Sequence, residues 1–382
     1  MSPHPFVIRP AAKQDLPQLV AMENVCFESD RLSRRSFQRF IGKGTDGFWV
    51  AEADEGLAGY ILVLYRRGTN LARLYSLAVR PEYRGQGLAT RLEGVAEEEA
   101  RDRGCVFVRL EVRIDNQPAI AHYRKQGYRT IGRIEDYYED GSAAWRMEKR
   151  VHLQTVPPSD ALPYYAQTIE FTCGPASLMM AMKAHDPTLA LNRRLELQLW
   201  REATTIFMTS GHGGCSPHGL ALAAWRRGFR VQVYINSTDV PFIEGVRSED
   251  KRAVMALVHH DFLDQIAETD IETHYSGFST QLLRQQLDAG ARVLVLISTY
   301  RLSRSKSPHW VLLTELDDDF AYINDPDVDL EDLQSETDNI HVPIPLEVFD
   351  RMARFGQRRL RAALIVRWRD RSGVGPGQEG NG

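Results

Sequence analysis

The sequence of 382 residues has only four cysteines, at positions 26, 105, 173 and 215, and they form no Cys-x-x-Cys pair. This spacing argues against a disulfide framework and against a four-cysteine zinc site. A net charge of −4 gives no basis for electrostatic binding of nucleic acid. The apolar runs are too short to cross a bilayer, and the N-terminus lacks the apolar core of a signal peptide. We therefore expect a cytoplasmic protein with no nucleic-acid or membrane partner.

A hydrophobic content of 43% with mixed charge is sufficient for two globular domains. Prolines at 157, 158 and 163 indicate a linker over residues 151–163. We predict a first domain over 1–150, a second over 164–370, and a disordered glycine-rich tail over 371–382. The oligomeric state is not indicated.

A glycine-rich turn, Val79-Arg80-Pro81-Glu82-Tyr83-Arg84-Gly85-Gln86-Gly87-Leu88-Ala89, separates an apolar strand (71–79) from an amphipathic helix (88–103). Two glycines let the backbone approach a ligand, and the amides that open a helix attract anions. Such a turn suits a pyrophosphate, although a plain strand-to-helix connection is the default interpretation of glycines alone.

The order Arg84-x-x-Gly87-x-Ala89 resembles the acyl-CoA signature of the GNAT N-acetyltransferases, Arg/Gln-x-x-Gly-x-Gly/Ala. The expected element order, β-α-α-β-β-β-α-β-α-β, is also that of the GNAT fold, which has a central mixed sheet. The resemblance implies acetyl-CoA as co-substrate. It implies binding by Leu77, Val79, Arg84, Gly85, Gln86, Gly87, Leu88 and Ala89.

Residues 110–123, Leu-Glu-Val-Arg-Ile-Asp-Asn-Gln-Pro-Ala-Ile-Ala-His-Tyr, resemble the matching segment of the ribosomal-protein alanine N-acetyltransferases. That GNAT subgroup acetylates protein N-terminal α-amines. The resemblance implies Glu111 as general base, Tyr123 as the acid for the coenzyme A thiolate, and Asn116 on the pantetheine arm. It also implies that residues 136–141 border the acceptor peptide. From the residues alone, a solvent-facing charge in an alternating strand is the favoured interpretation of Glu111, and Tyr123 is compatible with ordinary core packing.

Cys173 opens an apolar helix in Gln167-Thr-Ile-Glu-Phe-Thr-Cys173-Gly-Pro-Ala-Ser-Leu178. The positive end of a helix stabilises a thiolate, and Gln167 can donate to an oxyanion. The segment resembles the nucleophile region of the papain-like peptidases that remove bacteriocin leaders after a double glycine, where Gln-x5-Cys-Gly recurs. A cysteine at a helix start is otherwise usually a small apolar residue.

The resemblance requires a histidine and a carboxylate downstream. His309 heads one predicted strand and Asp325 ends the next, with a turn at 317–319 between them. A hairpin folded about Asp317 places residue 309 opposite residue 325, so both side chains share a face while Asn324 points away. We therefore predict a Cys173-His309-Asp325 triad.

Two further groups suggest metal binding only weakly. His212, Cys215 and His218 lie close together in sequence, but a glycine loop leading into a helix over 217–227 explains them better. His259 and His260 are adjacent on a predicted helix, so they face different ways, and we expect both on the surface. We predict no metal site.

These observations predict an α/β (α+β) protein with an N-terminal GNAT fold and a C-terminal papain-like cysteine peptidase fold. The predicted function is acetyl-CoA-dependent N-acetyl transfer to a peptide or protein amine, joined to a cysteine peptidase activity. Two alternatives remain for the second domain: a non-catalytic peptide-binding module, or a thiol acyltransferase that forms amides.

Overall fold

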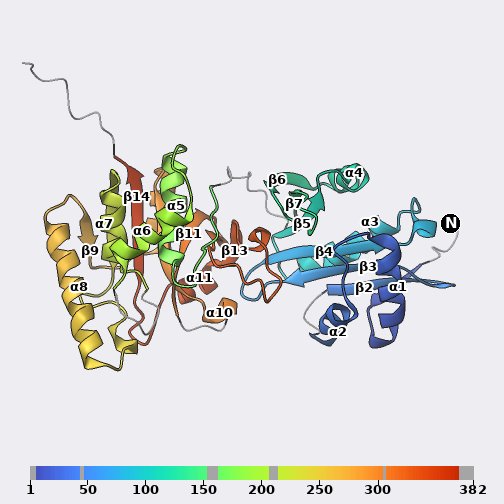
Figure 1. The fold of residues 1–382 in the computed structure, drawn as a ribbon, viewed down its shortest axis with the longest axis horizontal. Coiled ribbons are helices and arrows are strands. Elements are labelled where there is room, and N and C mark those ends of the chain that lie inside the picture. The colour runs from blue at the N-terminus through green and yellow to red at the C-terminus, as the bar shows by residue number, and fades with distance from the viewer. Residues whose placement is uncertain (1–5, 44–46, 153–161, 206–213, 304–306, 370–382) are drawn as a thin grey trace, which may run out of the picture. The chain divides into compact units, whose positions relative to one another are not determined.

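A computed structural model describes residues 6–43, 47–152, 162–205, 214–303 and 307–369 (Figure 1). Contacts divide the chain into two compact units, Met1–Pro158 and Ser159–Gly382. The predicted tail over 371–382, most of the predicted linker over 151–163, and His212 lie outside the described residues.

The N-terminal unit is built on a seven-stranded mixed sheet with the order β1-β2-β3-β4-β5-β7-β6. Its strands are β1 Val7–Pro10, β2 Gly47–Ala53, β3 Gly56–Tyr65, β4 Leu71–Val79, β5 Phe107–Arg113, β6 Arg129–Ile134 and β7 Ala144–Arg150. Its α-helices are α1 Leu16–Cys26, α2 Arg34–Lys43, α3 Leu88–Asp102 and α4 Gln117–Lys125. The expected order is therefore present, with β7 added at its end.

Apolar side chains cover both faces of this sheet. Leu88 and Leu92 of α3 and Ile120 of α4 pack in one cluster with the strands. On the other face, Phe37 of α2 packs edge-to-face against Tyr60 of β3. Figure 1 shows α1 and α2 on the side of the sheet away from α3 and α4. The sheet is thus buried on both faces by helices.

Strands β4 and β5 are parallel and separate part-way along their length. They pair over Leu71–Arg73 and Phe107–Arg109, but β4 runs on to Val79 and β5 to Arg113. A bulge in β4 at Tyr75, seen as a register shift against β3, bends β4 at the point of separation. The result is an opening between two strands of one sheet.

The C-terminal unit holds a second seven-stranded sheet, ordered β13-β12-β11-β10-β14-β8-β9. Its strands are β8 Phe229–Ile235, β9 Glu272–His274, β10 Arg292–Ser298, β11 Pro308–Leu316, β12 Phe320–Asn324, β13 Val342–Pro345 and β14 Ala362–Trp368. Its α-helices are α5 Cys173–His185, α6 Arg193–Ala203, α7 Pro217–Trp225, α8 Glu249–Ala267, α9 Thr280–Asp288, α10 Tyr300–Ser303 and α11 Leu346–Met352.

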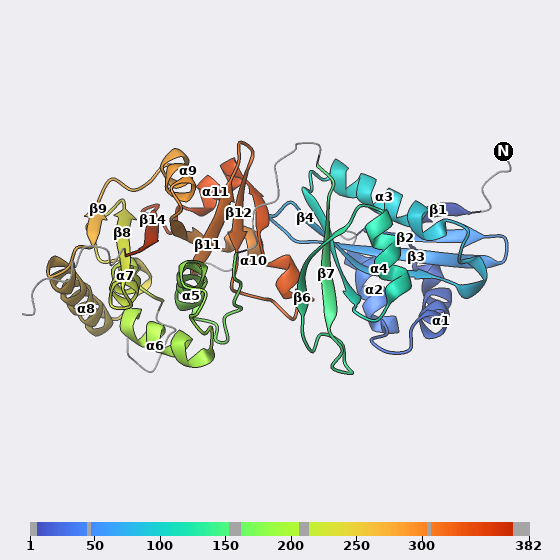
Figure 2. The same cartoon turned by 90° about the horizontal axis from the view of Figure 1, so that it is seen from above.

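Two apolar clusters sandwich this sheet. One joins α5 and α7 to the even-numbered residues of β11, such as Trp310 and Leu312. The other joins α9 and α11 to the odd-numbered residues, such as Val311 and Leu313. Figure 2 shows α5 and α6 on one side of the sheet and α9 and α11 on the other. Residues that alternate along β11 therefore reach different layers.

The expectation that His259 lies on the surface is wrong. His259 of α8 is 5% exposed and packs edge-to-face, at an interplanar angle of 69°, on His218 of α7, which is 1% exposed. His260, the next residue, is exposed. Helix α8 therefore directs His259 inward and His260 outward. A short polar sequence does not show which of the two is buried.

In the described part of the chain, no helix has the length and apolar character of a membrane span. The same residues contain no group of three or more metal-ligating side chains. All four cysteines are free thiols.

Candidate active sites

The glycine-rich turn is exposed and leads directly into α3. Gly85 and Gly87 have φ angles of +77° and +76°, which side-chain-bearing residues rarely adopt. A Cβ at either position would meet no described atom within 4 Å, so backbone conformation rather than crowding requires glycine. No described side chain caps α3, which leaves its first amides open. The turn therefore suits the phosphates of a nucleotide-like ligand.

The other predicted acyl-CoA residues surround this turn. Arg84 is exposed, and its Nε donates to the carbonyl oxygen of Val79 at 3.1 Å. Gln86 donates to the Glu82 carbonyl oxygen at 3.1 Å. Leu77, Val79 and Ala89 are half-buried, and Leu88 is buried. These residues run from the opening between β4 and β5 to the amides of α3.

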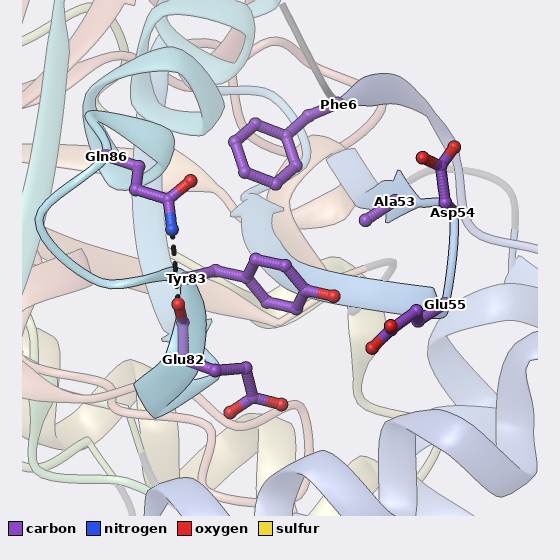
Figure 3. Close-up of a pocket in the computed structure, with 7 residues that line it drawn as sticks. All are labelled: Phe6, Ala53, Asp54, Glu55, Glu82, Tyr83 and Gln86. Carbon is purple, nitrogen blue, oxygen red and sulfur yellow. Dashed lines mark hydrogen bonds between the residues drawn. The ribbon is translucent and has the colours of Figure 1, made fainter.

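A hollow of about 320 Å³ lies on another side of the turn (Figure 3). It is lined by Phe6, Ala53, Asp54, Glu55, Glu82, Tyr83 and Gln86. Three carboxylates in this hollow repel phosphate groups. The amide side of the turn therefore suits an anion better than this hollow does.

Asn116 is the N-cap of α4, and its Oδ1 accepts from the backbone N–H of Ala119 at 3.2 Å. This bond uses the oxygen of the side-chain amide and leaves its Nδ2 as a donor. A role on a pantetheine arm therefore requires that Nδ2 does the binding.

Glu111 lies on β5 at the opening and is held in a buried ion pair. Its carboxylate is 2.9 Å from Nε of Arg73, and the two side chains are 4% and 3% exposed. Arg73 also donates to the hydroxyl of Tyr137 at 2.9 Å. The solvent-facing alternative for Glu111 is therefore wrong. The carboxylate of Glu111, the guanidinium of Arg73 and the phenol of Tyr137 therefore lie together beside the opening.

Tyr123 of α4 is 8% exposed, and its ring packs edge-to-face on Tyr128. Burial raises the pKa of Tyr123, and the charges of Glu93 and Tyr138 raise it further. Its hydroxyl therefore keeps its proton at neutral pH and can donate it. The same packing makes Tyr123 part of the core.

A buried carboxyl that the sequence analysis missed lies behind the opening. Glu23 of α1 accepts from the hydroxyl of Tyr60 at 2.5 Å and from the N–H of Leu32 at 2.8 Å. The Tyr60 hydroxyl also bonds to Ser76, on the part of β4 that has left β5. Burial raises the pKa of Glu23. In the sequence, the signal for a buried carboxyl was the position of Glu23 next to Met22, on the apolar face of α1.

In the second unit, Cys173 is the first residue of α5 and is 7% exposed. Within the described residues, no side chain caps α5, so the positive helix end faces the thiol. The next residue, Gly174, is tightly enclosed: a Cβ there would lie 3.1–3.2 Å from Leu220, Cys215 and Trp310. Cys173 is thus rigidly placed at the edge of the core.

His309 and Asp325 meet in the interior of the same unit. Nε2 of His309 lies 2.7 Å from Oδ1 of Asp325, and the residues are 5% and 2% exposed. Burial opposes protonation of His309, but the charges of Asp325 and Cys173, and hydrogen bonds with both, raise its pKa well above the ordinary value. The three predicted triad residues therefore interact, with His309 in the middle.

The predicted hairpin register is wrong, although the contact is present. Leu312 pairs with Asn324, so continued pairing would place Asp325 beside Val311 rather than opposite His309. A bulge at Thr314 shifts the register between Leu313 and Glu315. Without it, Asp325 would fall on the opposite face from His309. The two residues therefore meet as diagonal neighbours on one face.

The side chain of Gln167 is turned toward Asp327. Its Nε2 donates to Oδ1 of Asp327 at 3.1 Å and to the carbonyl oxygen of Glu170 at 3.4 Å. The backbone N–H of Asp327 donates in turn to Oδ1 of Asp325 at 3.1 Å. Among the contacts described, none joins Gln167 to Cys173. Asp327 thus links the predicted oxyanion donor to the triad carboxylate, and sequence reasoning did not find it.

A second missed residue, Glu196 of α6, anchors the segment that leads to Cys173. This fully buried carboxylate accepts from the Tyr165 hydroxyl at 3.0 Å and from the Thr168 N–H at 2.8 Å. It also accepts from the hydroxyls of Thr168 and Thr172 at 2.6 and 2.5 Å. Four donors on one buried acceptor fix the position of the residues just before the nucleophile.

Replacing Glu196 by alanine is expected to lower the free energy of unfolding of the C-terminal unit by about 2–4 kcal/mol, because buried donors lose their acceptor. Chemical denaturation measures this change. Glu202→Ala is the matched control on the same helix, since Glu202 pairs with Arg227 at a half-exposed site and should contribute under about 1 kcal/mol. Equal effects of the two changes would contradict the anchoring role.

Two family models match the chain. The Acetyltransferase (GNAT) family model spans residues 16–128, and the Peptidase_C39 like family model spans residues 162–367. The N-terminal unit is therefore a GNAT acetyltransferase domain, and its acyl donor is acetyl-CoA, as predicted. The second model covers more than half of the 382 residues, so the chain belongs to the Peptidase_C39 like family. These matches confirm the predicted fold class.

Relatives of known name match the N-terminal unit. An N-alpha-acetyltransferase of Saccharolobus solfataricus is 30% identical over 38% of this chain and 92% of its own length. A putative [ribosomal protein bS18]-alanine N-acetyltransferase of Bacillus subtilis is 29% identical over 35% of this chain and 87% of its own. The solved ribosomal-protein-S18-alanine N-acetyltransferase of Escherichia coli is 24% identical, with a TM-score of 0.36 over 40% of this chain and 99% of that one.

Proposed function

We propose that the chain is bifunctional. The N-terminal unit transfers acetyl to the α-amine of a peptide or protein, and the C-terminal unit cleaves a peptide bond through a thioester on Cys173. The observation that carries the second activity is the buried 2.7 Å bond between His309 and Asp325, with Cys173 close enough to share a hydrogen bond with His309. The four free thiols fit the reducing cytosol.

In the first site, Glu111 takes a proton from the acceptor amine, directly or through water, and Tyr123 protonates the departing thiolate. The amides at Gly87 and the start of α3, with Arg84 beside them, hold the phosphates. The names of the curated relatives, an N-alpha-acetyltransferase and an alanine N-acetyltransferase, support an α-amine as acceptor.

Arg84→Glu is expected to weaken coenzyme A binding about tenfold or more, because it replaces a cation beside the phosphates by an anion. Titration calorimetry with coenzyme A measures the change. Arg101→Glu, on the same helix α3 but at its far end, is the control and should leave affinity unchanged. Unchanged affinity in Arg84→Glu would contradict the assignment of the turn.

In the second site, Cys173 attacks a peptide carbonyl while Asp325 holds His309 in position. His309 then gives its proton to the departing amine, and water releases the acyl group from the thioester. The open amides at the start of α5 stabilise the developing oxyanion, together with Gln167 if its amide leaves Asp327.

One observation favours an alternative for this unit. Because Gln167 is bonded to Asp327 rather than directed at Cys173, the site is also compatible with a module that binds peptides without cutting them. In that case, the module would present peptides to the acetyltransferase.

The fusion suggests sequential action: the C-terminal unit exposes a new N-terminus, which the N-terminal unit then acetylates. The test is a reaction of the full chain with acetyl-CoA and a peptide mixture, read by mass spectrometry. Wild type should yield new, acetylated N-termini, Cys173→Ala none, and Tyr123→Phe new N-termini without acetyl. Equal acetylation by wild type and Cys173→Ala, with no cleavage in either, would favour the binding module instead.

A further inference from the structure

A second thiol lies beside the proposed nucleophile. Cys215, just before α7, is 2% exposed, and its Cβ is 3.2 Å from the place that a Cβ on Gly174 would occupy. Gly174 follows Cys173 directly in the first turn of α5. The carbonyl oxygen of Cys215 accepts from Nε1 of Trp310 at 3.2 Å, and Trp310 directly follows His309. Cys215 is therefore packed against the residues that directly follow Cys173 and His309 in the chain.

The two thiols differ in chemical character. Burial raises the pKa of Cys215 well above its ordinary value, and the charge of Cys173 raises it further. Burial keeps the thiol of Cys215 protonated, so Cys215 does not react with oxidants by itself, whereas Cys173 faces the positive end of α5 and interacts with His309. Oxidants should therefore attack Cys173 first.

We propose that Cys215 is a resolving cysteine that protects Cys173 from irreversible oxidation by forming a Cys173–Cys215 disulfide. This inference rests on the proposed function, since it needs Cys173 to be a reactive thiolate. The oxidant is hydrogen peroxide or another hydroperoxide.

In the first step, the Cys173 thiolate attacks one peroxide oxygen, the O–O bond breaks, and sulfenic acid and hydroxide form. In the second step, the sulfur of Cys215 attacks the sulfur of the sulfenic acid. The S–S bond forms, the S–O bond breaks, and the proton of Cys215 leaves with the hydroxyl as water. Peroxide gains two electrons, and each sulfur loses one. A dithiol reductant reverses the change.

The disulfide would block the nucleophile, so oxidation would switch off the C-terminal site and leave the acetyltransferase residues intact. Burial of both sulfurs favours the intramolecular reaction over attack by a second peroxide, because little solvent reaches the sulfenic acid.

The test treats the full-length reduced protein with hydrogen peroxide and maps its peptides by mass spectrometry without reduction. We expect the Cys173 and Cys215 peptides to be joined, alkylation of Cys173 by iodoacetamide to be lost, and both changes to reverse with dithiothreitol. In Cys215→Ala, peroxide should leave a sulfenic acid on Cys173 that dimedone traps as an adduct. Without dimedone, this sulfenic acid should oxidise further to sulfinic acid. Cys105→Ala, which removes a buried thiol from the other unit, should behave as wild type.

Conversion of Cys173 to sulfinic acid in wild type, with no joined peptide, would overturn the inference while leaving the proposed nucleophile intact. A Cys173 that reacts with neither iodoacetamide nor peroxide would overturn both. If Cys215→Ala fails to fold, the wild-type peptide map decides alone.

Discussion

Tyr123→Phe is expected to lower the turnover number of acetyl transfer about 100-fold while the affinity for coenzyme A changes little. The change removes the one proton that Tyr123 can give to the departing thiolate and keeps the buried ring that packs on Tyr128. General-acid catalysis is typically worth about 100-fold or more. Turnover is measured by release of coenzyme A with an acceptor peptide at saturation, and affinity by calorimetry.

The pH profile distinguishes an acid from a packing residue. Because burial raises the pKa of Tyr123, its acid form persists above the ordinary tyrosine value of about 10. The wild-type rate should therefore show no fall on the alkaline side up to about pH 10. Tyr128→Phe is the matched control at the neighbouring ring and should keep nearly full turnover. Equal losses in the two variants would assign Tyr123 to the core instead.

His309→Ala is expected to reduce the alkylation rate of Cys173 at about pH 6 roughly 100-fold. The raised pKa of His309 keeps its imidazolium charged at this pH, and a cation beside a cysteine promotes alkylation of that cysteine. Without that charge, an ordinary thiol with a pKa of about 8.5 is ionised to well under about 1% at pH 6. The rate is measured with iodoacetamide by peptide mass.

Asp325→Asn should have an intermediate effect, because it removes the charge that holds His309 in its protonated form. His185→Ala is the matched control: His185 ends the helix that Cys173 begins, and it bonds to the Val366 carbonyl oxygen. A His309→Ala rate equal to that of the control would contradict an activated thiolate.

Local patterns of the sequence predicted the elements that carry the first site. The left-handed glycines Gly85 and Gly87 and the apolar spacing of α3 are local features, so the turn and the helix could be read directly. The opening between β4 and β5 could not be predicted from local features. It depends on a bulge at Tyr75, a pairing detail that has no local signature.

The sequence also did not predict the contacts between residues that lie far apart in the chain. Arg73 and Glu111 lie 38 residues apart and neutralise each other only because β4 and β5 are neighbours. Glu196 bonds to residues 24–31 positions earlier, through a fold that brings α6 beside the segment before Cys173. No periodicity marks such pairs, since each partner alone resembles an ordinary charged residue.

The second site shows how a contact can be expected for an incorrect reason. His309 and Asp325 were expected to be cross-strand partners, but they meet as diagonal neighbours because Thr314 bulges out of β11. A hairpin drawn without the bulge has the wrong register. The chemistry of histidine, carboxylate and cysteine was therefore a better guide than the counting of residues across the turn.

The central claim is that Cys173 is an activated nucleophile. The most direct test is a brief exposure of the native wild-type protein to iodoacetamide at mildly acidic pH, with modification read at each cysteine by peptide mass. Half-buried Cys26 and buried Cys105 and Cys215 serve as internal references. We predict that Cys173 alone reacts fast. Modification of Cys173 no faster than that of Cys26 would contradict the claim and leave an acetyltransferase joined to a peptide-binding domain.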